Sequence, residues 1–460
     1  KIGNMGSKED VSDYTVVNIG KDITLRGWTG VFIDQDEGLC YGVKVNCSAK
    51  IEKTEAFEKD ASGIYINGSI KATEGNVPVV NLDGCRINVK SAGIYAAGFA
   101  KWNLKNCDIV AENAAVEIRA GEMVIDGGKY EATADPLTVA PNGNGATVEG
   151  AAIGVSQHTT NLPTSVTIKK GTFSGAYSIW EKDVQDEVAR DVITLSVENG
   201  TFNGSVYSQN NTSFIKGGTF SDAPAQDYLA EGYASTRTIT SMSSDVKEYT
   251  VKKVTEVSDA GSLIKAAEDG ESYIRLMSDI EVDRTVIVGS NWSYVTLDLN
   301  GHKITNSKSM WNADKGDWSI LSLRSISGYL IVKGNGIIEA KEESDDSKDA
   351  YAIDVQNKSA KVLLVDGEFV GRTHSVYSFA GDVYIEGGKY SNTNKEKHDY
   401  VINCYDVNYK DDKAANIIVK GGEFANFNPG DCRAEGEHTS FLASGYKSVQ
   451  DGDWYKVVAE

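Results

Sequence analysis

The chain has 460 residues, of which 40% are hydrophobic and 24% charged, and 46 basic against 66 acidic side chains give a net charge of −20 at pH 7. A chain this acidic repels nucleic-acid backbones, and no basic stripe offsets the charge, so we expect no nucleic-acid partner. No apolar run approaches the roughly 18 residues of a membrane-spanning helix, which predicts no transmembrane segment. No signal peptide is recognised in KIGNMGSKED, where Met does not stand first, so the missing targeting segment is uninformative.

One short phrase recurs along the chain. EMVIDGGKYEA at 122–132 returns as DVYIEGGKYSN at 382–392, and further copies end at Gly175, Gly204, Asp222, Gly371 and Asn426. Aligning the copies defines one glycine slot, held by Gly128, Gly171, Gly200, Gly218, Gly367, Gly388 and Gly422, with Cys85, Cys107, His302 and Asn335 placed in the same slot. Such internal similarity is the signature of a repeat fold.

A second strand precedes each copy. Its forms are SGIYI at 62, AGIYA at 92, AAVEI at 114, AAIGV at 151, YSIWE at 177, GSVYS at 204, YAIDV at 351, HSVYS at 374 and YVINC at 400. Apolar residues alternate with a period of two, and β-branched and aromatic residues dominate. Three short strands in a repeat of about 21 residues predict a parallel β-helix, whose strands stack about 4.8 Å apart.

This arrangement resembles the right-handed, pectin-lyase-like β-helix superfamily over most of the chain. The V-x-G-G-T-F and LDLNGHKIT phrases are similar to those of bacterial cell-surface proteins built on this solenoid, and adhesins and phage tail fibres also use it. The resemblance implies a polysaccharide groove along the face of the first strand. It is specific for architecture, whereas function has to be argued from a site.

The copies form two groups. DYLAEGYASTRTITSMSSDVKEYTVKKV at 227–254 and SFLASGYKSVQDGDWYKVVAE at 440–460 end the groups alike, as terminators of exposed last coils. Ser258 is the expected N-cap of a helix that ends at Gly270 and closes the start of the second group, with Leu263, Ile264 and Ala267 on one face. We therefore predict an all-β chain of two tandem right-handed parallel β-helix solenoids, 1–254 and 255–460, with terminal caps and one short capping helix.

The variable position of the second strand carries the candidate binding residues. It alternates with core positions such as Ile64 and Ile94, so it is expected to point outward. The column holds Tyr65, Tyr95, Glu117, Gly154, Trp180 and Tyr207 in the first group and Asp354, Tyr377 and Asn403 in the second. Outward aromatic rings suit sugar faces and protein partners, which makes Tyr65, Tyr95, Trp180, Tyr207 and Tyr377 candidate carbohydrate-binding residues. The alternative is that stacked tyrosines only stabilise the sheet.

Three residues in the glycine slot have simple structural interpretations. His302 is interpreted as a turn residue that tolerates a left-handed backbone rather than as a catalytic group. Cys85 and Cys107 are expected to stack in adjacent coils, as small packing residues or, alternatively, as a disulfide. Cysteine spacing along the chain does not fit a zinc site.

Acidic clusters occur at 34–38, 312–317 and 342–349. Each favours a solvated loop, with calcium binding as the alternative, because none has the regular spacing of a calcium loop. We expect no other cofactor. The metal content of the protein is left open at this point.

No catalytic constellation is apparent. Arg372, Thr373 and His374 are interpreted as an exposed coil corner, and Glu117 and Asp354, the carboxylates of the column, belong to different groups. We therefore expect a non-enzymatic bacterial surface or secreted protein, located outside the cell, that binds a glycan or a protein on a host or neighbouring surface. The alternatives are a polysaccharide lyase or glycoside hydrolase of the same fold and a phage fibre component.

Overall fold

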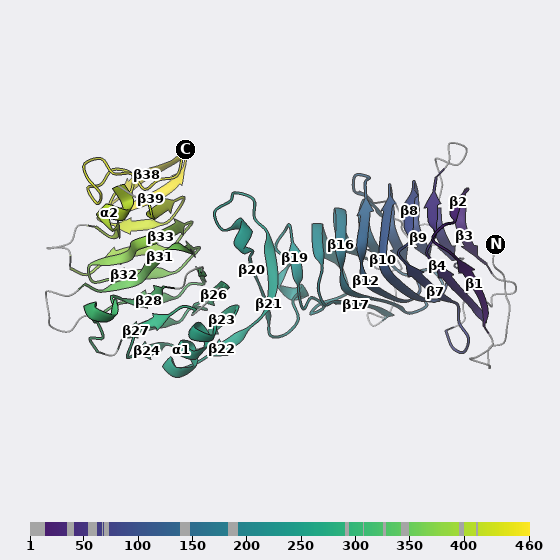
Figure 1. The fold of residues 1–460 in the computed structure, drawn as a ribbon, viewed down its shortest axis with the longest axis horizontal. Helices are drawn as coiled ribbons and strands as arrows, with labels where there is room; N and C mark the ends of the chain where they lie inside the picture. The colour runs from purple at the N-terminus through teal and green to yellow at the C-terminus, as the bar shows by residue number, and fades with distance from the viewer. Residues whose placement is uncertain are drawn as a thin grey trace. The chain divides into compact units, whose positions relative to one another are not determined.

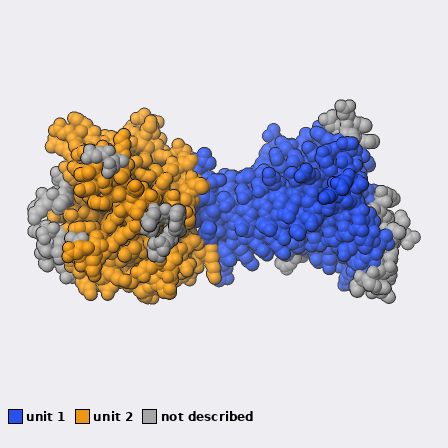
Figure 2. Space-filling view, viewed as in Figure 1, with its two compact units in different colours: residues 1–238, 246–252 blue, residues 239–245, 253–460 orange. Residues whose placement is uncertain are grey.

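The computed structural model describes residues 14–34, 41–53, 62–66, 68, 73–138, 148–182, 192–289, 294–306, 308–324, 328–341, 349–394, 400–410 and 413–460. The chain divides into two compact units, coloured separately in Figure 2. Unit 1 comprises residues 1–238 and 246–252, and unit 2 comprises residues 239–245 and 253–460. Both units are built from β-strands that pair mainly in parallel, so the all-β class is confirmed (Figure 1).

The described strands of unit 1 form three parallel ladders. The first contains β1 (Thr15–Ile19), β4 (Val43–Cys47), β7 (Val79–Asp83), β10 (Lys101–Ala111), β12 (Gly121–Ala132), β16 (Thr164–Glu181) and β17 (Ile193–Val197). The second adds β2 (Thr24–Arg26), β5 (Lys50–Glu52), β8 (Arg86–Val89), β18 (Thr201–Ser208) and β19 (Gly218–Phe220). The third adds β3 (Thr29–Ile33), β6 (Ser62–Ile66), β9 (Ala92–Ala96), β11 (Ala114–Ile118) and β15 (Ala151–Val155). The long strands β10, β12 and β16 turn from one ladder into the next.

The described strands of unit 2 repeat this plan. One ladder contains β22 (Thr255–Val257), β23 (Tyr273–Leu276), β26 (Tyr294–Asp298), β29 (Tyr329–Lys333), β31 (Tyr351–Leu364), β33 (His374–Ile385) and β36 (Ala415–Val419). The next contains β24 (Ile280–Val282), β27 (Lys303–Asn306), β30 (Ile337–Glu339), β32 (Glu368–Gly371), β34 (Lys389–Asn392) and β37 (Glu423–Ala425). The third contains β25 (Val286–Ile287), β28 (Ser319–Leu323), the first halves of β31 and β33, and β35 (Ile402–Cys404).

The register explains why the phrase recurs. Cys107 lies opposite Gly128, Thr172 opposite Thr201, and Glu368 opposite Lys389, so these copies stack as aligned. At Gly128, where φ is 104°, an added Cβ would lie 2.1 Å from the carbonyl oxygen of Cys107, so the stacking itself requires glycine.

The aromatic residue after each glycine turn packs inside the stack. Tyr130, Phe173, Phe202 and Phe220 follow one another in unit 1 with ring centroids 5.2, 5.1 and 4.6 Å apart. Phe369, Tyr390 and Phe424 do the same in unit 2 at 5.1 and 4.9 Å. Each ring covers the next in a close-packed core, so a single repeat cannot bury its own ring.

In unit 2 the slot assignment needs one correction. Lys303 pairs with Ile337, which places His302 opposite Gly336 and not opposite Asn335. The φ angle of His302 is not positive. The left-handed positions of this turn are instead Asn300, with φ at 48°, and Gly301, with φ at 80°. Its Nδ1 lies 3.4 Å from an oxygen of Asp279 on the surface. His302 is thus a loop residue, but the left-handed backbone that we expected there is wrong.

The helix α1 (Ala260–Asp269) starts unit 2 and buries Leu263, Ile264, Ala266 and Ala267. Its N-cap is Asp259 rather than the predicted Ser258, because the Asp259 side chain accepts from the backbone N–H of Ser262 and forms a capping box. Gly270 ends the helix in a left-handed conformation, as predicted. A second short helix, α2 (Asp406–Lys410), was not predicted.

Both C-terminal segments switch the pairing direction. In unit 1, β21 (Tyr249–Lys253) pairs antiparallel with β19, and in unit 2, β39 (Trp454–Ala459) pairs antiparallel with β37 and with β38 (Tyr446–Asp451). An antiparallel strand covers the edge that the last parallel strand would otherwise expose.

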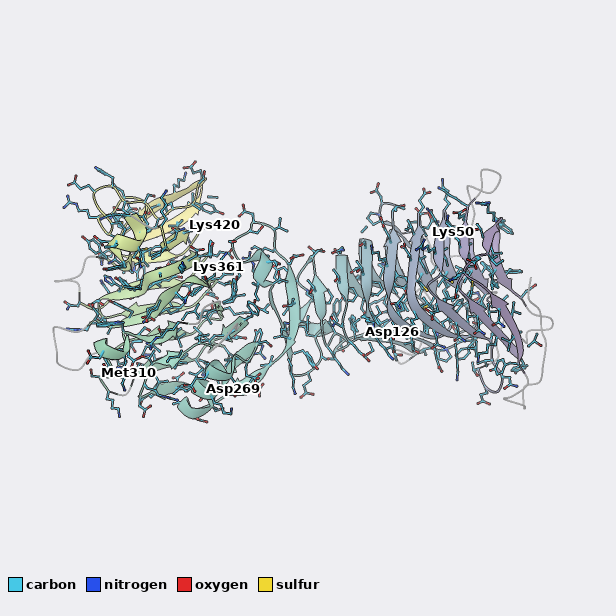
Figure 3. All side chains as sticks on the ribbon, in the orientation of Figure 1. Lys50, Asp126, Asp269, Met310, Lys361 and Lys420 are labelled. Carbon is cyan, nitrogen blue, oxygen red and sulfur yellow. The ribbon has the colours of Figure 1, made fainter. Side chains whose placement is uncertain are left out.

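The remaining described elements are short: β13 (Leu137–Thr138), β14 (Val148–Glu149), β20 (Tyr233–Arg237) and the 3-10 turns η3 (Gln226–Tyr228), η4 (Ile239–Ser241) and η5 (Ala313–Lys315). The segment 239–245 belongs to unit 2, where Met242 packs on Ile331 and Leu363. Lys420, labelled in Figure 3, pairs there with Asp245.

An asparagine ladder crosses the first strands of unit 1. The Nδ2 atom of Asn46 donates to Oδ1 of Asn18 at 2.8 Å, Asn81 donates to Asn46 at 2.8 Å, and Asn103 donates to Asn81 at 2.9 Å. Asn46 and Asn81 each donate one bond and accept another, so the ladder favours the in-register pairing of these strands.

We predict that Asn81→Ala lowers the free energy of unfolding by about 1–2 kcal/mol, because two ladder hydrogen bonds are lost. Asn103→Ala removes one bond and should cost about half as much. Urea denaturation followed by circular dichroism measures both variants. Equal losses for the two substitutions would contradict a ladder in which Asn81 makes two stabilising bonds and Asn103 one.

Candidate functional site

The principal candidate site is a cleft in unit 2 with a volume of about 310 Å³. Its lining consists of aromatic side chains, two carboxylates and one amide: Trp318, Asp349, Tyr351, Asp354, Gln356, Tyr377, Phe379 and Tyr405. The volume is at the lower end of the roughly 300–1,000 Å³ of small-molecule sites, and a mainly aromatic lining with a few polar groups is typical of them.

The period of the strands places the cleft on the outer face. Asp354 in β31 lies opposite Tyr377 in β33, while their neighbours Ile353 and Val376 belong to the core cluster. The predicted column is therefore correct in register for unit 2, and Ser322 precedes Asp354 in it. Tyr405 follows β35, and its backbone is held because its N–H donates to the carbonyl of Ser378 and its carbonyl accepts from the N–H of Tyr409 in α2.

Two stacked aromatic pairs wall the cleft. Tyr351 and Tyr377 have ring centroids 4.8 Å apart with planes at 19°, and Phe379 and Tyr405 are also 4.8 Å apart at 21°. Phe379 is 44% exposed and Tyr405 is 38% exposed. Open aromatic faces of this kind offer apolar surface to a flat ligand at little cost in side-chain entropy.

One carboxyl group in the lining of the cleft is held in place by hydrogen bonds. Asp354 is 1% exposed and accepts from Oγ of Ser319 at 2.9 Å and from Nε2 of Gln356 at 2.6 Å. Burial raises the pKa of Asp354, although hydrogen bonds from Ser322, Gln356 and Ser319 oppose the shift. The group is held as an oriented hydrogen-bond acceptor.

The predicted corner Arg372, Thr373 and His374 lies behind the cleft and is buried, so the expectation of an exposed corner is wrong. The His374 ring stacks on Tyr351 at 5.4 Å and on Tyr377 at 5.6 Å. Its Nδ1 is 2.6 Å from the carbonyl oxygen of Tyr400, so Nδ1 carries a proton and donates it. The imidazole thereby packs against both rings of the Tyr351–Tyr377 pair.

Glu435 lies beside the last strand of the column. It is 5% exposed, its Oε1 accepts from the N–H of Cys404 at 2.8 Å, and its Oε2 is buried without a hydrogen-bond partner. Burial raises the pKa of Glu435 from its ordinary value near 4.5 to about 7, with a further increase from Asp406 and an opposing effect of the hydrogen bond from Cys404.

This shift predicts a pH-dependent stability for unit 2. The unfolded carboxyl ionises first as the pH rises above about 4.5, so the free energy of unfolding should fall by up to about 3 kcal/mol by the time the pH passes 7. Glu435→Gln should remove this fall while keeping an acceptor for Cys404. Denaturation at pH 5 and pH 8 measures the difference, with the exposed Glu437→Gln as control. A wild-type pH dependence in Glu435→Gln would disprove the assignment.

Unit 1 carries the other predicted residues. Tyr65 lies opposite Tyr95 with ring centroids 4.8 Å apart, and Phe32, which was not among the predicted residues, continues the row with its tilted ring centred 5.3 Å from that of Tyr65. Val31 and Ile33 on either side of Phe32 are buried, and that alternation is the signal that identifies it. All three rings are half-buried.

A buried ion pair ends this stack. Nε of Arg119 donates to Oε1 of Glu117 at 2.8 Å, and both side chains are nearly inaccessible, at 1% and 4% exposed. The Arg119 guanidinium lies 5.3 Å from the centre of the Tyr95 ring. Burial raises the pKa of Glu117, and Arg119 counteracts that shift. Glu117 is therefore a paired structural carboxylate, and Arg119 is a residue that the column alone does not reveal.

Beyond Glu117 the column is interrupted at Gly154. Trp180, which we expected to be accessible, is 4% exposed and packs against Ala151 and Tyr177. That expectation is wrong, because neighbouring side chains on the outer face cover the indole. Tyr207 is 38% exposed, with its ring centroid 6.4 Å from that of Trp180.

The described cysteines are unbonded. Cys85 and Cys107 are fully buried in the core, as the packing interpretation predicts, and Sγ of Cys85 donates to the carbonyl of Cys47 at 2.9 Å. The disulfide alternative is not seen in the structure.

Most of the acidic clusters fall beyond what the structure describes, since 35–38 and 342–348 lie outside it. In 312–317, Asp317 accepts from Nη2 of Arg324 at 2.8 Å. Within the described ranges, no group of three or more His, Cys, Asp and Glu side chains is placed to hold a metal ion.

No helix in the described part of the chain is long and apolar enough to cross a membrane. No family model, curated protein or solved structure matches the chain in the comparisons made with each. The candidate site therefore has to be interpreted from its own geometry.

Proposed function

We propose that the chain is a non-enzymatic carbohydrate-binding protein whose two units are right-handed parallel β-helices of the pectin-lyase-like kind. The three parallel ladders of each unit support the architecture, because the chain returns to the same ladder once per repeat. Rows of in-register strands give a stiff scaffold on which side chains from successive repeats keep a fixed spacing. Such a scaffold suits recognition of an external glycan.

The observation that carries this proposal is the pairing of two stacked aromatic walls with the oriented carboxyl of Asp354 in one cleft. A pyranose ring presents apolar C–H faces and a rim of hydroxyl groups. The rings of Phe379 and Tyr405 can pack against the C–H faces, and the oxygens of Asp354 and Gln356 can accept hydrogen bonds from the hydroxyl groups. We place the sugar in this cleft, with Tyr377 as the candidate residue that the sequence already identified.

The proposed setting is the outside of a cell. Adhesion of a bacterial surface or secreted protein to glycans of a host or neighbouring cell would use such a cleft, and the net charge of −20 disfavours nucleic acid as a partner. The half-buried rings of Phe32, Tyr65 and Tyr95 in unit 1 are the second candidate sugar-contacting surface.

A glycan microarray probed with the intact protein tests the proposal. Two folded variants locate the site: Phe379→Ala with Tyr405→Ala in unit 2, and Tyr65→Ala with Tyr95→Ala in unit 1. Binding that disappears only in the unit 2 variant is expected. Binding that disappears only in the unit 1 variant would move the site, and an array without any bound glycan would refute sugar binding.

Glycoside hydrolysis is the second candidate, because Asp349 and Asp354 line the same cleft and two carboxyl groups are the usual catalytic pair. The hydrogen bonds from Ser319 and Gln356 to Asp354 fit a fixed acceptor better than an acid that must give up its proton. Incubation of a bound oligosaccharide with the protein should release no reducing ends. Release that is lost in Asp349→Asn would establish hydrolysis instead.

A further inference from the structure

The charges around the unit 2 cleft indicate the class of sugar it takes, an inference that rests on the proposed sugar binding. Asp349 and Asp354 both line the cleft, and no Lys or Arg does so among the described residues. Asp349 is half-buried, so bulk water screens its charge less than at an open surface.

Arg324 is the basic side chain whose charge acts on Asp354, and its N–H groups already donate hydrogen bonds to other residues. Nη2 of Arg324 donates to the carbonyl of Gly316 at 2.6 Å and to Asp317 at 2.8 Å, and its Nε donates to Oγ of Ser322 at 2.8 Å. Nη1 donates to the carbonyl of Lys315 at 3.2 Å. Arg324 therefore stabilises the surrounding loop and is not placed to clamp a ligand anion.

The amide in the cleft has also used its donors. Nε2 of Gln356 donates to the carbonyl of Gly316 at 2.7 Å and to Asp354 at 2.6 Å. An amide nitrogen has two hydrogens, so Gln356 offers a ligand only its Oε1 acceptor. Together with the two carboxyl groups, this makes the floor of the cleft rich in acceptors.

We propose that the cleft selects uncharged sugar residues and rejects uronates. The hydroxyl groups of a neutral ring donate to the acceptors of Asp349, Asp354 and Gln356 while its C–H faces lie against Phe379 and Tyr405. The carboxylate of a uronate would meet the carboxylate of Asp349, with no Lys or Arg in the described lining of the cleft to offset it, and like charges brought together in an interface are strongly unfavourable.

A glycan array with matched charge tests this selection. It carries neutral oligosaccharides of hexoses, N-acetylhexosamines and deoxyhexoses, and oligogalacturonides, oligoglucuronides and oligomannuronides each as free acid and as methyl ester. The strongest binders should be neutral, and a free acid should bind at least about tenfold more weakly than its own ester. A free acid that binds as well as its ester would overturn the inference while leaving sugar binding intact.

Asp349→Asn is the matched variant. Removing this charge should narrow the preference for ester over acid by several-fold, whereas Asp382→Asn, on β33 but outside the cleft lining, should leave the preference unchanged. If the preference for ester over acid falls equally in both variants, the net charge of the protein causes it rather than the cleft, and the inference is overturned. If no glycan on the array binds, the proposed sugar binding is disproved, and this inference is disproved with it.

Discussion

Sugar affinity is expected to fall at least about thirtyfold when Phe379 and Tyr405 are both replaced by alanine, since truncating a central aromatic contact typically costs about 2 kcal/mol or more. The two rings stack on each other and form the exposed wall of the cleft. Because both are more than a third exposed, their loss should change the stability of unit 2 much less than it changes binding. Isothermal titration with the best oligosaccharide from the array measures the affinity.

Tyr294→Ala is the control for this prediction. Tyr294 is 41% exposed, lies against Tyr329 with ring centroids 5.0 Å apart and does not line the cleft, so it is comparable to the removed rings in exposure and chemistry. It should leave the affinity within about twofold of the wild type. Unchanged affinity in the Phe379 and Tyr405 double variant would show that the sugar lies elsewhere.

Phe202→Ala is expected to destabilise unit 1 by about 3–5 kcal/mol, the cost of emptying a fully buried phenylalanine site. Phe202 is 0% exposed and lies between Phe173 and Phe220, with ring centroids at 5.1 and 4.6 Å. Both neighbours lose a stacking partner, and the parallel ladders on either side limit how far the cavity can collapse.

Chemical denaturation followed by circular dichroism tests this effect. Phe424→Ala empties a fully buried site at the end of the corresponding aromatic row in unit 2, so comparing the two variants identifies which transition belongs to which unit. Tyr207→Ala, at an exposed position of the same strand as Phe202, should cost about 1 kcal/mol or less. A Phe202→Ala loss as small as that of Tyr207→Ala would contradict a continuous aromatic core.

Much of this arrangement could be predicted from the repeats. In parallel, in-register ladders the same side chain recurs at the same place in each coil, so aligning the phrases already pairs Tyr65 with Tyr95 and Asp354 with Tyr377. The alternation of these residues with buried neighbours also predicts that they lie on the outer face of the sheet. The misassignment of Asn335 to the glycine slot arose because Asn335 and Gly336 are adjacent in the turn and both fit the sequence pattern.

The parts of the site that could not be predicted come from outside the strand column. Tyr405 follows a strand end, Trp318 precedes β28 and Asp349 precedes β31, so no repeat pattern marks them. The burial of Trp180 and His374 could not be predicted for a related reason, because each packs against one side chain of its own strand and one of a neighbouring strand. A period of two assigns a side chain to a face and does not say what covers that face.

The most direct measurement of the central claim is a crystal structure of the full chain grown with the oligosaccharide that binds best on the array. The account predicts density for a sugar ring against Phe379 and Tyr405, with hydroxyl oxygens within hydrogen-bonding distance of Asp354 or Gln356. Density against Tyr65 and Tyr95 of unit 1, with the unit 2 cleft open to solvent, would contradict it.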